Sequence, residues 1–299
     1  MNIVLLTFTK DAASMNMRTH LLEYFSQTNI VFDSYTVLEK KDFQGESKKC
    51  YVLTTDKESI FYENIDKEIL RQTNISPDLL IFCTKHESKA KIQSLSCHTQ
   101  GNFGKARYGG KDFSLGICPS IVMENAFLAI QEAIKKEDLA FEPIIECTHH
   151  GPYVETPSLF IEIGSSNEAF TNESVGKVMA TIICKVVEKT TKEDIILQSK
   201  VPTKSLFQKP SIVGLGGLHH CPSFSKRIKH FYVGHVCPKY QLEQLTKASL
   251  EEAILKTIPL PTHIVLDWKG MTDKERVLNI VQELSLQYNL TVKKIKDFD

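Results

Sequence analysis

Short apolar segments alternate with amphipathic helical patterns along this 299-residue chain, and that alternation restricts the fold more than any other feature. Apolar runs of a few residues are typical of strands that are buried on both faces. Such runs lie at residues 3–8, 30–37, 51–54, 79–84, 144–148, 159–163, 212–215, 231–233 and 263–266. Helical spacing recurs between them, in Val122, Ala126, Ala129 and Ala133, in Val175, Val178, Ile182 and Val186, and in Val277, Ile280, Val281 and Leu284.

Strands that alternate with helices predict a largely parallel sheet with helices on its faces. No repeat, low-complexity tract or long linker divides the sequence, so we expect one α/β domain over residues 1–299 with a central, largely parallel or mixed sheet. Residues 85–118 depart from this rhythm because they are polar and contain several glycines. A long irregular segment in a compact domain is usually a lid or a binding loop, and we predict that role here.

The composition is that of an ordinary globular protein, with 42% hydrophobic and 24% charged residues. Lysine plus arginine and aspartate plus glutamate both total 36, so any site for an anion must be a local patch. The eight cysteines form no CxxC pair and no disulfide-framework spacing, which is typical of reduced intracellular thiols. Because no signal region and no membrane-length apolar run is present, we expect a cytoplasmic protein without membrane contact.

Residues 146–152 read Glu-Cys-Thr-His-His-Gly-Pro and concentrate reactive groups at the end of a predicted strand. The segment combines the carboxylate of Glu146, the thiol of Cys147 and the imidazoles of His149 and His150 with a turn-forming Gly-Pro pair. Adjacent residues of a strand point to opposite faces. Cys147 is therefore better interpreted as a packing thiol than as a nucleophile that works with His149.

Histidines follow the ends of several predicted strands. They are His86, His149, His150, His219, His220 and His235. The carboxyl ends of parallel strands share one edge of a sheet, so we expect these six side chains to converge on one site. A single histidine near a strand end is commonly an ordinary polar group, but two His-His pairs beside turn residues favour a function.

Two kinds of chemistry fit this histidine set. Glu146 and Glu162 are close to it in the sequence, and histidine and carboxylate ligands could hold a zinc ion with one position open for water. The alternative needs no metal, because an imidazole can act as general base while a carboxylate orients it. The chain has no HExxH sequence, so the spacing does not decide between the two.

Glycines at residues 214–217 follow another predicted strand. A dinucleotide-binding motif is excluded because His219 stands where that motif requires glycine or alanine. Gly216 and Gly217 would instead allow backbone N–H groups to approach an anion or a substrate carbonyl.

Residues 101–111 combine three cations, two aromatic residues and four glycines. The cations are Lys105, Arg107 and Lys111. Positive side chains neutralise phosphates and aromatic rings stack on unpaired bases, so this segment suits a single-stranded RNA end better than a duplex. From composition alone, a solvated β-hairpin fits the segment equally well.

With these motifs in order, the sequence resembles the archaeal and plant type of D-aminoacyl-tRNA deacylase, nearly from end to end. The motifs that carry the resemblance are residues 85–88 (KHES), 96–102 (SCHTQGN), 146–152 (ECTHHGP), 162–165 (EIGS), 214–222 (GLGGLHHCP) and 234–240 (GHVCPKY). One difference is His220, where the resemblance leads us to expect tyrosine more often.

The resemblance implies hydrolysis of the ester that joins a D-amino acid to the 3′ end of tRNA, and also of aldehyde-modified D-aminoacyl-tRNAs. It implies a fold similar to those of peptidyl-tRNA hydrolase and nucleoside phosphorylases, a Zn²⁺ cofactor and a monomeric state. We expect the catalytic residues to be His86, His98, His149, His150, Glu146 and Glu162, and the candidate metal ligands are His149, His150, His86 and Glu162. Substrate or RNA contacts would come from Asn102, Lys105, Arg107, Lys111, Gly216, Gly217, His219, His235 and Lys239.

An aminoacyl ester is already activated, so a positioned water, a base and an oxyanion donor suffice without a covalent nucleophile. If the terminal ribose 2′-hydroxyl assists, the protein mainly positions the ester and excludes L-substrates. Two other functions stay open: a zinc hydrolase of a small ester or amide, and a tRNA-end binding module without catalysis. The zero net charge favours the small-substrate hydrolase, whereas the six motifs favour the deacylase.

Overall fold

The structure, a computed structural model, describes residues 1–41, 48–88, 91–196, 208–269, 271 and 273–299. The strands are β1 (Asn2–Phe8), β2 (Phe25–Phe32), β3 (Tyr35–Lys40), β4 (Lys49–Thr55), β5 (Leu79–His86), β6 (Ser94–His98), β7 (Cys118–Pro119), β8 (Glu142–Ile145), β9 (Ser158–Gly164), β10 (Ser211–Gly216), β11 (Tyr232–Cys237), β12 (Thr257–Ile258), β13 (His263–Asp267) and β14 (Thr291–Lys294). The helices are α1 (Ala12–Leu21), α2 (Ile65–Thr73), α3 (Ser120–Lys136), α4 (Asn167–Thr171), α5 (Glu173–Lys189), α6 (Pro222–Ser225), α7 (Lys247–Leu255) and α8 (Lys274–Tyr288). Short 3-10 helices are η1 (Ser59–Phe61), η2 (Lys239–Gln244) and η3 (Ile295–Phe298).

The larger of two main sheets has eight strands in the order β2-β3-β4-β1-β5-β9-β6-β8. Strands β4, β1, β5 and β9 run parallel to one another. Strands β6 and β8 are parallel to each other but antiparallel to β9. Reversal of direction between β9 and β6 places the end of β6 beside the start of β9, and this determines where the site forms.

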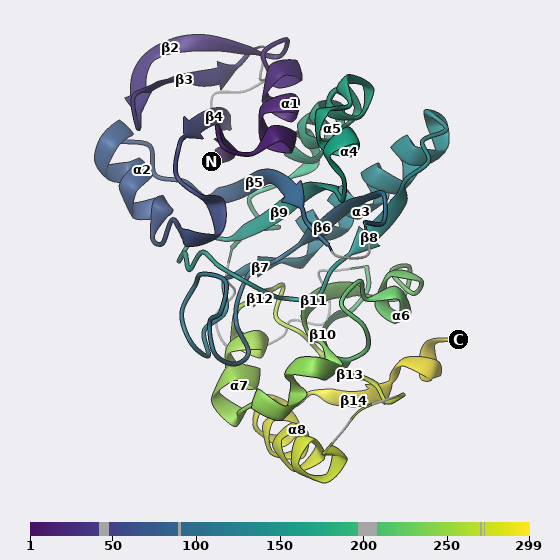
Figure 1. The fold of residues 1–299 in the computed structure, drawn as a ribbon. Helices are drawn as coiled ribbons and strands as arrows, with labels where there is room; N and C mark the ends of the chain where they lie inside the picture. The colour runs from purple at the N-terminus through teal and green to yellow at the C-terminus, as the bar shows by residue number, and fades with distance from the viewer. Residues whose placement is uncertain (42–47, 89–90, 197–207, 270, 272) are drawn as a thin grey trace.

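Helices cover both faces of this sheet because its central strands are apolar on both sides. Ile3 and Leu5 of β1 face the core formed with α1, α3 and α5, whereas Val4 and Leu6 pack with α2 on the opposite face. Figure 1 shows α1, α4 and α5 gathered on one side of the sheet and α2 on the other.

A second sheet of four parallel strands has the order β11-β10-β13-β14. Val213 and Leu215 of β10 pack against α7 and α8, which lie at the far end of the molecule in Figure 1. Ile212 of β10 and Val233 of β11 face the other way and join the core of the large sheet. The strand pair β7-β12 lies between the two sheets, and the backbone N–H of Cys147, after β8, donates to the carbonyl of His219, after β10.

The predicted α/β class, with a mostly parallel sheet flanked by helices, is confirmed, and α3, α5 and α8 carry the predicted helical faces. Residues 30–37 were expected to form one strand, but they span the hairpin of β2 and β3. Asp33 and Ser34 adopt positive φ angles of 44° and 72°, which suits a two-residue hairpin turn. None of the described helices is long and apolar enough to span a membrane.

The predicted loop at residues 85–118 contains a strand within its described part, which leaves out residues 89–90. Strand β6 lies fully buried between β9 and β8. Its apolar signal is weak because Ser94, Ser96 and His98 alternate with Leu95 and Cys97. Only Leu95 and Cys97 face the apolar core, so the polar residues occupy the opposite face of a buried strand.

Candidate active site

Five of the six strand-end histidines lie together, and His98 joins them. Ring centroids are 4.3 Å apart for His149 and His150, 4.3 Å for His98 and His149, and 4.5 Å for His149 and His219. The ring of His86 lies 6.3 Å from that of His219 and 5.6 Å from that of His220.

The reason for this convergence differs from the expectation of one shared sheet edge. His98 at the end of β6 pairs with Phe160 near the start of β9, whereas His86 at the end of β5 pairs with Gly164 at the end of β9. Because β6 and β8 run against β9, their histidines approach His86 from the opposite direction. The site therefore lies alongside β9, and the side chain of Glu162 is at its centre.

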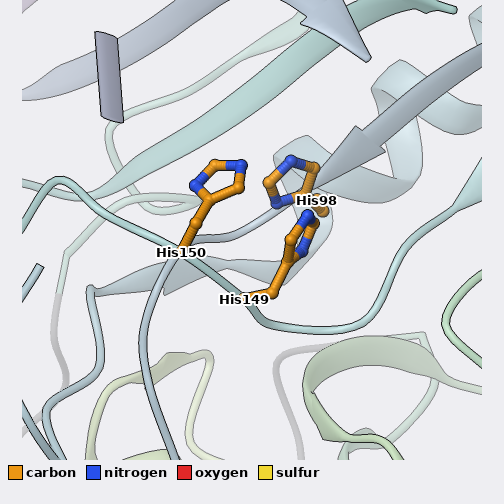
Figure 2. A group of neighbouring side chains, drawn as sticks. All are labelled: His98, His149 and His150. Carbon is orange, nitrogen blue, oxygen red and sulfur yellow. The ribbon is translucent and has the colours of Figure 1, made fainter. Parts of the chain in front are cut away.

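His98, His149 and His150 form a first group, which we call the imidazole trio. One nitrogen of each ring lies within 4.8 Å of the other two, and Figure 2 shows the three rings facing one another. Each Nδ1 lies near a backbone carbonyl oxygen, at 3.2 Å, 2.8 Å and 2.6 Å respectively, and so donates its hydrogen there. This arrangement leaves the Nε2 lone pairs of the trio available to a common ligand.

The trio is placed in surroundings that disfavour positive charge. Burial, together with the neighbouring imidazole of His98, lowers the pKa of His149 well below its ordinary value and that of His150 to about 4. Nε2 of His98 lies 3.5 Å from Oε2 of Glu162 and has no hydrogen-bond partner in the described residues. Burial would raise the pKa of Glu162, but contacts with His86 and His98 lower it to about 2, so this carboxylate is ionised.

Glu146, His86 and His219 form a second group, which we call the Glu146 group. Oε2 of Glu146 lies 3.1 Å from Nδ1 of His86 and 2.9 Å from Nε2 of His219. Burial alone would lower the pKa of both histidines, yet their hydrogen bonds raise each pKa to about 10, and those bonds include Glu146 in both cases. The same contacts hold the pKa of Glu146 well below its ordinary value, against the effect of burial.

Both groups border a cavity of about 1050 Å³. His86, His149, His150, Glu162 and His219 line its inner part, and together with the buried His98 and Glu146 that contact them they form what we call the cavity floor. Exposed residues on one side of the opening, Lys105, Arg107 and Tyr108, form what we call the cavity mouth. The molecule therefore joins a floor of buried imidazoles and carboxylates to a cationic, aromatic entrance.

This combination can be compared with known proteins. The sequence profile of the D-aminoacyl-tRNA deacylases matches residues 73–289. The chain belongs to the D-aminoacyl-tRNA deacylase family. It is 36% identical to the D-aminoacyl-tRNA deacylases of Pyrococcus furiosus and of Thermococcus kodakarensis, over 95% of this chain and 98% of each relative. A crystal structure of a conserved protein of unknown function matches all of this chain and 96% of its own, with a TM-score of 0.82 and 26% identity.

In this member of the deacylase family, the predicted RNA-binding segment is only partly directed towards the cavity. Lys105 and Arg107 line the cavity, and Nζ of Lys105 lies 2.6 Å from Asp112. Asn102 also borders the cavity, but its amide donates to the carbonyl of Gly109 at 3.0 Å and so holds the loop. Nζ of Lys111 lies 3.8 Å from the centroid of the Tyr153 ring, outside the cavity lining.

Other predicted substrate contacts lie behind the cavity wall. His235 is fully buried, with Nδ1 3.1 Å from the hydroxyl of Thr148 and Nε2 3.1 Å from the carbonyl of Gly116. Burial lowers the pKa of His235 to about 3. His235 thus packs where β11 meets the loop after β8, outside the cavity lining.

Gly216 and Gly217 shape the chain instead of lining the cavity. At Gly216 the φ angle is +95°, and a Cβ atom there would lie 2.4 Å from the carbonyl oxygen of Asp267. The carbonyl of Gly217 accepts a hydrogen bond from the backbone N–H of Lys239, whose side chain is exposed outside the cavity lining. These glycines therefore create the tight turn that leads from β10 to His219.

The structure adds site residues that sequence reasoning missed. The hydroxyl of Thr84 donates to Oε1 of Glu162 at 2.7 Å, and strand alternation with His86 could have indicated it. The hydroxyl of Tyr240 lies 2.9 Å from Nδ1 of His219, in the segment after β11. Cys147 is fully buried, which agrees with its interpretation as a packing thiol.

Proposed function

We propose that this protein hydrolyses the ester between a D-amino acid and the 3′ end of tRNA, the chiral proofreading reaction of its family. Family membership supports the reaction, and the convergence of the imidazole trio beside Glu162 in the cavity floor is the observation that carries it. The family resemblance supports a monomeric cytoplasmic enzyme, and extends the proposed substrates to aldehyde-modified D-aminoacyl-tRNAs.

We also propose a zinc ion held by His98, His149 and His150, with Glu162 as the nearby carboxylate. The donor set fits zinc because each Nδ1 is fixed on a carbonyl, a common arrangement for metal-binding histidines, and Nε2 of His98 is buried without a partner in the described residues. A low pKa keeps His149 and His150 neutral, as ligation requires. Bound zinc would supply a Lewis acid that lowers the pKa of a coordinated water.

The remaining residues of the floor set the charge of the imidazoles and the orientation of Glu162. Glu146 accepts from Nδ1 of His86 and from Nε2 of His219, and these contacts, with Cys147 beside His219, raise the pKa of both imidazoles against burial and so favour their protonated form. A protonated imidazole beside the ester would stabilise the negative charge that develops on its oxygen atoms. Thr84 fixes Glu162 in the orientation that faces His98.

The cavity mouth supports tRNA as substrate over a small ester. Arg107 forms no ion pair with any described residue, and Tyr108 is 68% exposed at the same opening. A free guanidinium and an exposed ring suit the phosphates and bases of an unpaired strand. A small ester or amide would need neither group.

The decisive experiment measures hydrolysis of D-tyrosyl-tRNA and L-tyrosyl-tRNA by chelator-treated protein, before and after Zn²⁺ is restored. We expect D-specific hydrolysis that disappears on chelation and returns with zinc. Full D-specific activity in protein shown to be metal-free would support the imidazole-base mechanism and contradict the zinc proposal. Hydrolysis of small esters without hydrolysis of D-tyrosyl-tRNA would contradict the proposed function itself.

A further inference from the structure

A chain of hydrogen bonds leads from the buried Glu146 to an exposed phenol. Oε2 of Glu146 accepts from Nε2 of His219 at 2.9 Å, and Nδ1 of His219 lies 2.9 Å from the hydroxyl of Tyr240. The thiol of Cys147 lies 3.6 Å from the same hydroxyl. Glu146 and Cys147 are buried, so the phenol oxygen is held from behind by groups that cannot leave the core.

Three separate segments supply this chain of contacts. Glu146 and Cys147 follow β8, His219 follows β10, and Tyr240 belongs to η2, whose Gln244 accepts a hydrogen bond from the backbone N–H of Lys105 at 2.9 Å. Helix η2 therefore reaches from the cavity floor to the cavity mouth. A substrate that enters at Lys105 and reacts at the imidazole trio would pass Tyr240.

Tyr240 lines the cavity, the residue is 53% exposed, and its hydroxyl keeps a hydrogen-bonding position that the described residues do not fill. A hydroxyl has one hydrogen to donate and two lone pairs, so contact with His219 leaves capacity in either tautomer. His219 and Cys147 occupy at most two of these three hydrogen-bonding positions, so one position stays available whichever of them donates. The matching ligand group is one that both donates and accepts.

We propose that Tyr240 binds the 2′-hydroxyl of the terminal ribose and so positions the neighbouring 3′-ester over the imidazole trio, with Glu146 and His219 as positioning residues. This inference rests on the proposed deacylase function. A ribose hydroxyl both donates and accepts, which matches Tyr240 in either arrangement. The distances also agree, because only the ring of His219 separates the phenol from Glu146, and the His219 ring lies 4.5 Å from that of His149.

A fixed ribose would raise the rate of ester hydrolysis, because it would hold the ester in the orientation that reacts. The 2′ and 3′ carbons are adjacent, so a contact to the 2′-hydroxyl determines which face of the ester turns towards the floor. The assignment gives a role to Tyr240 that the trio and Glu162 do not supply, and it explains why an exposed tyrosine is fixed from behind by buried groups.

The test combines a protein change with a substrate change. Single-turnover hydrolysis is measured for wild type and Tyr240→Phe, on D-tyrosyl-tRNA and on the same tRNA with a 2′-deoxy terminal adenosine that carries the 3′-ester. We expect each change alone to slow hydrolysis about tenfold, and the two together to cost no more than one of them. tRNA affinity should change less than about twofold.

Control measurements distinguish a failure of this inference from misfolding of the variant and from a failure of the proposed function. Tyr288→Phe removes another hydrogen-bonded phenol, one that donates to Glu251 outside the cavity lining, and should leave all rates unchanged. His219→Gln offers a second variant that should lose sensitivity to the 2′-deoxy substitution. If the two losses multiply, or if wild type hydrolyses the deoxy substrate at full rate, the inference is wrong. If wild type shows no D-specific hydrolysis of either tRNA, the proposed function fails instead.

Discussion

The cavity floor and the cavity mouth differ in how firmly their side chains are fixed. In the floor, each imidazole of the trio is tied to a carbonyl, and Glu146 holds two more histidines within 3.1 Å. In the mouth, Arg107 and Tyr108 are exposed and reach into solvent. Chemistry requires fixed groups, whereas an unpaired RNA strand tolerates mobile cations and rings. We therefore assign the rate of reaction to the floor and the affinity for RNA to the mouth.

Within the floor, neighbouring histidines differ in the direction of their pKa shift. His149 has a lowered pKa because burial and other imidazoles surround it. Against burial, hydrogen bonds to Glu146 and Glu162 raise the pKa of His86 to about 10, and hydrogen bonds to Cys147 and Glu146 raise that of His219 to about 10. The buried carboxylate of Glu146, which His86 and His219 both contact, thus favours protonation of these two histidines, whereas His149 stays neutral and can ligate a metal.

The largest effect is expected from His149→Ala. Loss of one member of the trio should reduce bound zinc and slow single-turnover hydrolysis of D-tyrosyl-tRNA by at least about 100-fold. The affinity for deacylated tRNA should stay within about twofold of wild type. Metal analysis and single-turnover rates check both statements, with the exposed His230→Ala as control. Undiminished hydrolysis would contradict the histidine-centred site. A loss of tRNA affinity would contradict the assignment of RNA binding to the mouth alone.

A smaller effect is expected from Glu146→Gln, which removes the charge that His86 and His219 share. Hydrolysis should slow by about 10- to 100-fold without loss of tRNA affinity. Removal of the charge should also change how stability depends on pH, because the raised histidine pKa values depend on it.

The sign of that pH effect follows from the histidines. Their pKa is about 10 in the folded chain and ordinarily 6.5, so the folded state binds more protons between these values. Their stabilisation is complete below pH 6.5 and is lost as pH rises through about 10. Denaturant unfolding at several pH values should show the stability difference between wild type and Glu146→Gln shrinking over this window. A constant difference would mean that Glu146 does not hold these protons.

The smallest effect is expected from the double variant Lys105→Ala and Arg107→Ala in the mouth. Loss of two phosphate contacts should weaken tRNA binding by roughly tenfold and reduce its salt-dependence slope by roughly 1 to 1.5. Single-turnover hydrolysis at saturating enzyme should be nearly unchanged. Equilibrium binding across salt concentrations measures the slope, with Lys135→Ala and Lys136→Ala at the end of α3 as the matched control. A slower chemical step with an unchanged slope would place these residues with the floor.

The two aromatic residues of the predicted RNA-binding segment show that composition alone does not identify which rings are accessible. Phe103 and Tyr108 belong to the same glycine-containing segment, yet Phe103 is fully buried and Tyr108 is 68% exposed. Phe103 packs in the core of the second sheet with Leu242 and Leu250. Sequence spacing could not separate the two rings, because the loop that carries them is shaped by contacts with residues more than a hundred positions away.

The sequence by itself determined the α/β class, the helical faces of α3, α5 and α8, and most of the reactive residues. Apolar runs and helical periodicity are local signals, and the Glu146–Pro152 segment is concentrated enough to be found without a fold. Only the tertiary structure decided which histidines meet, because strand order and direction depend on long-range pairing. The antiparallel insertion of β6 and β8 beside β9 brought His98 into the trio, while burial at the junction of the sheets removed His235.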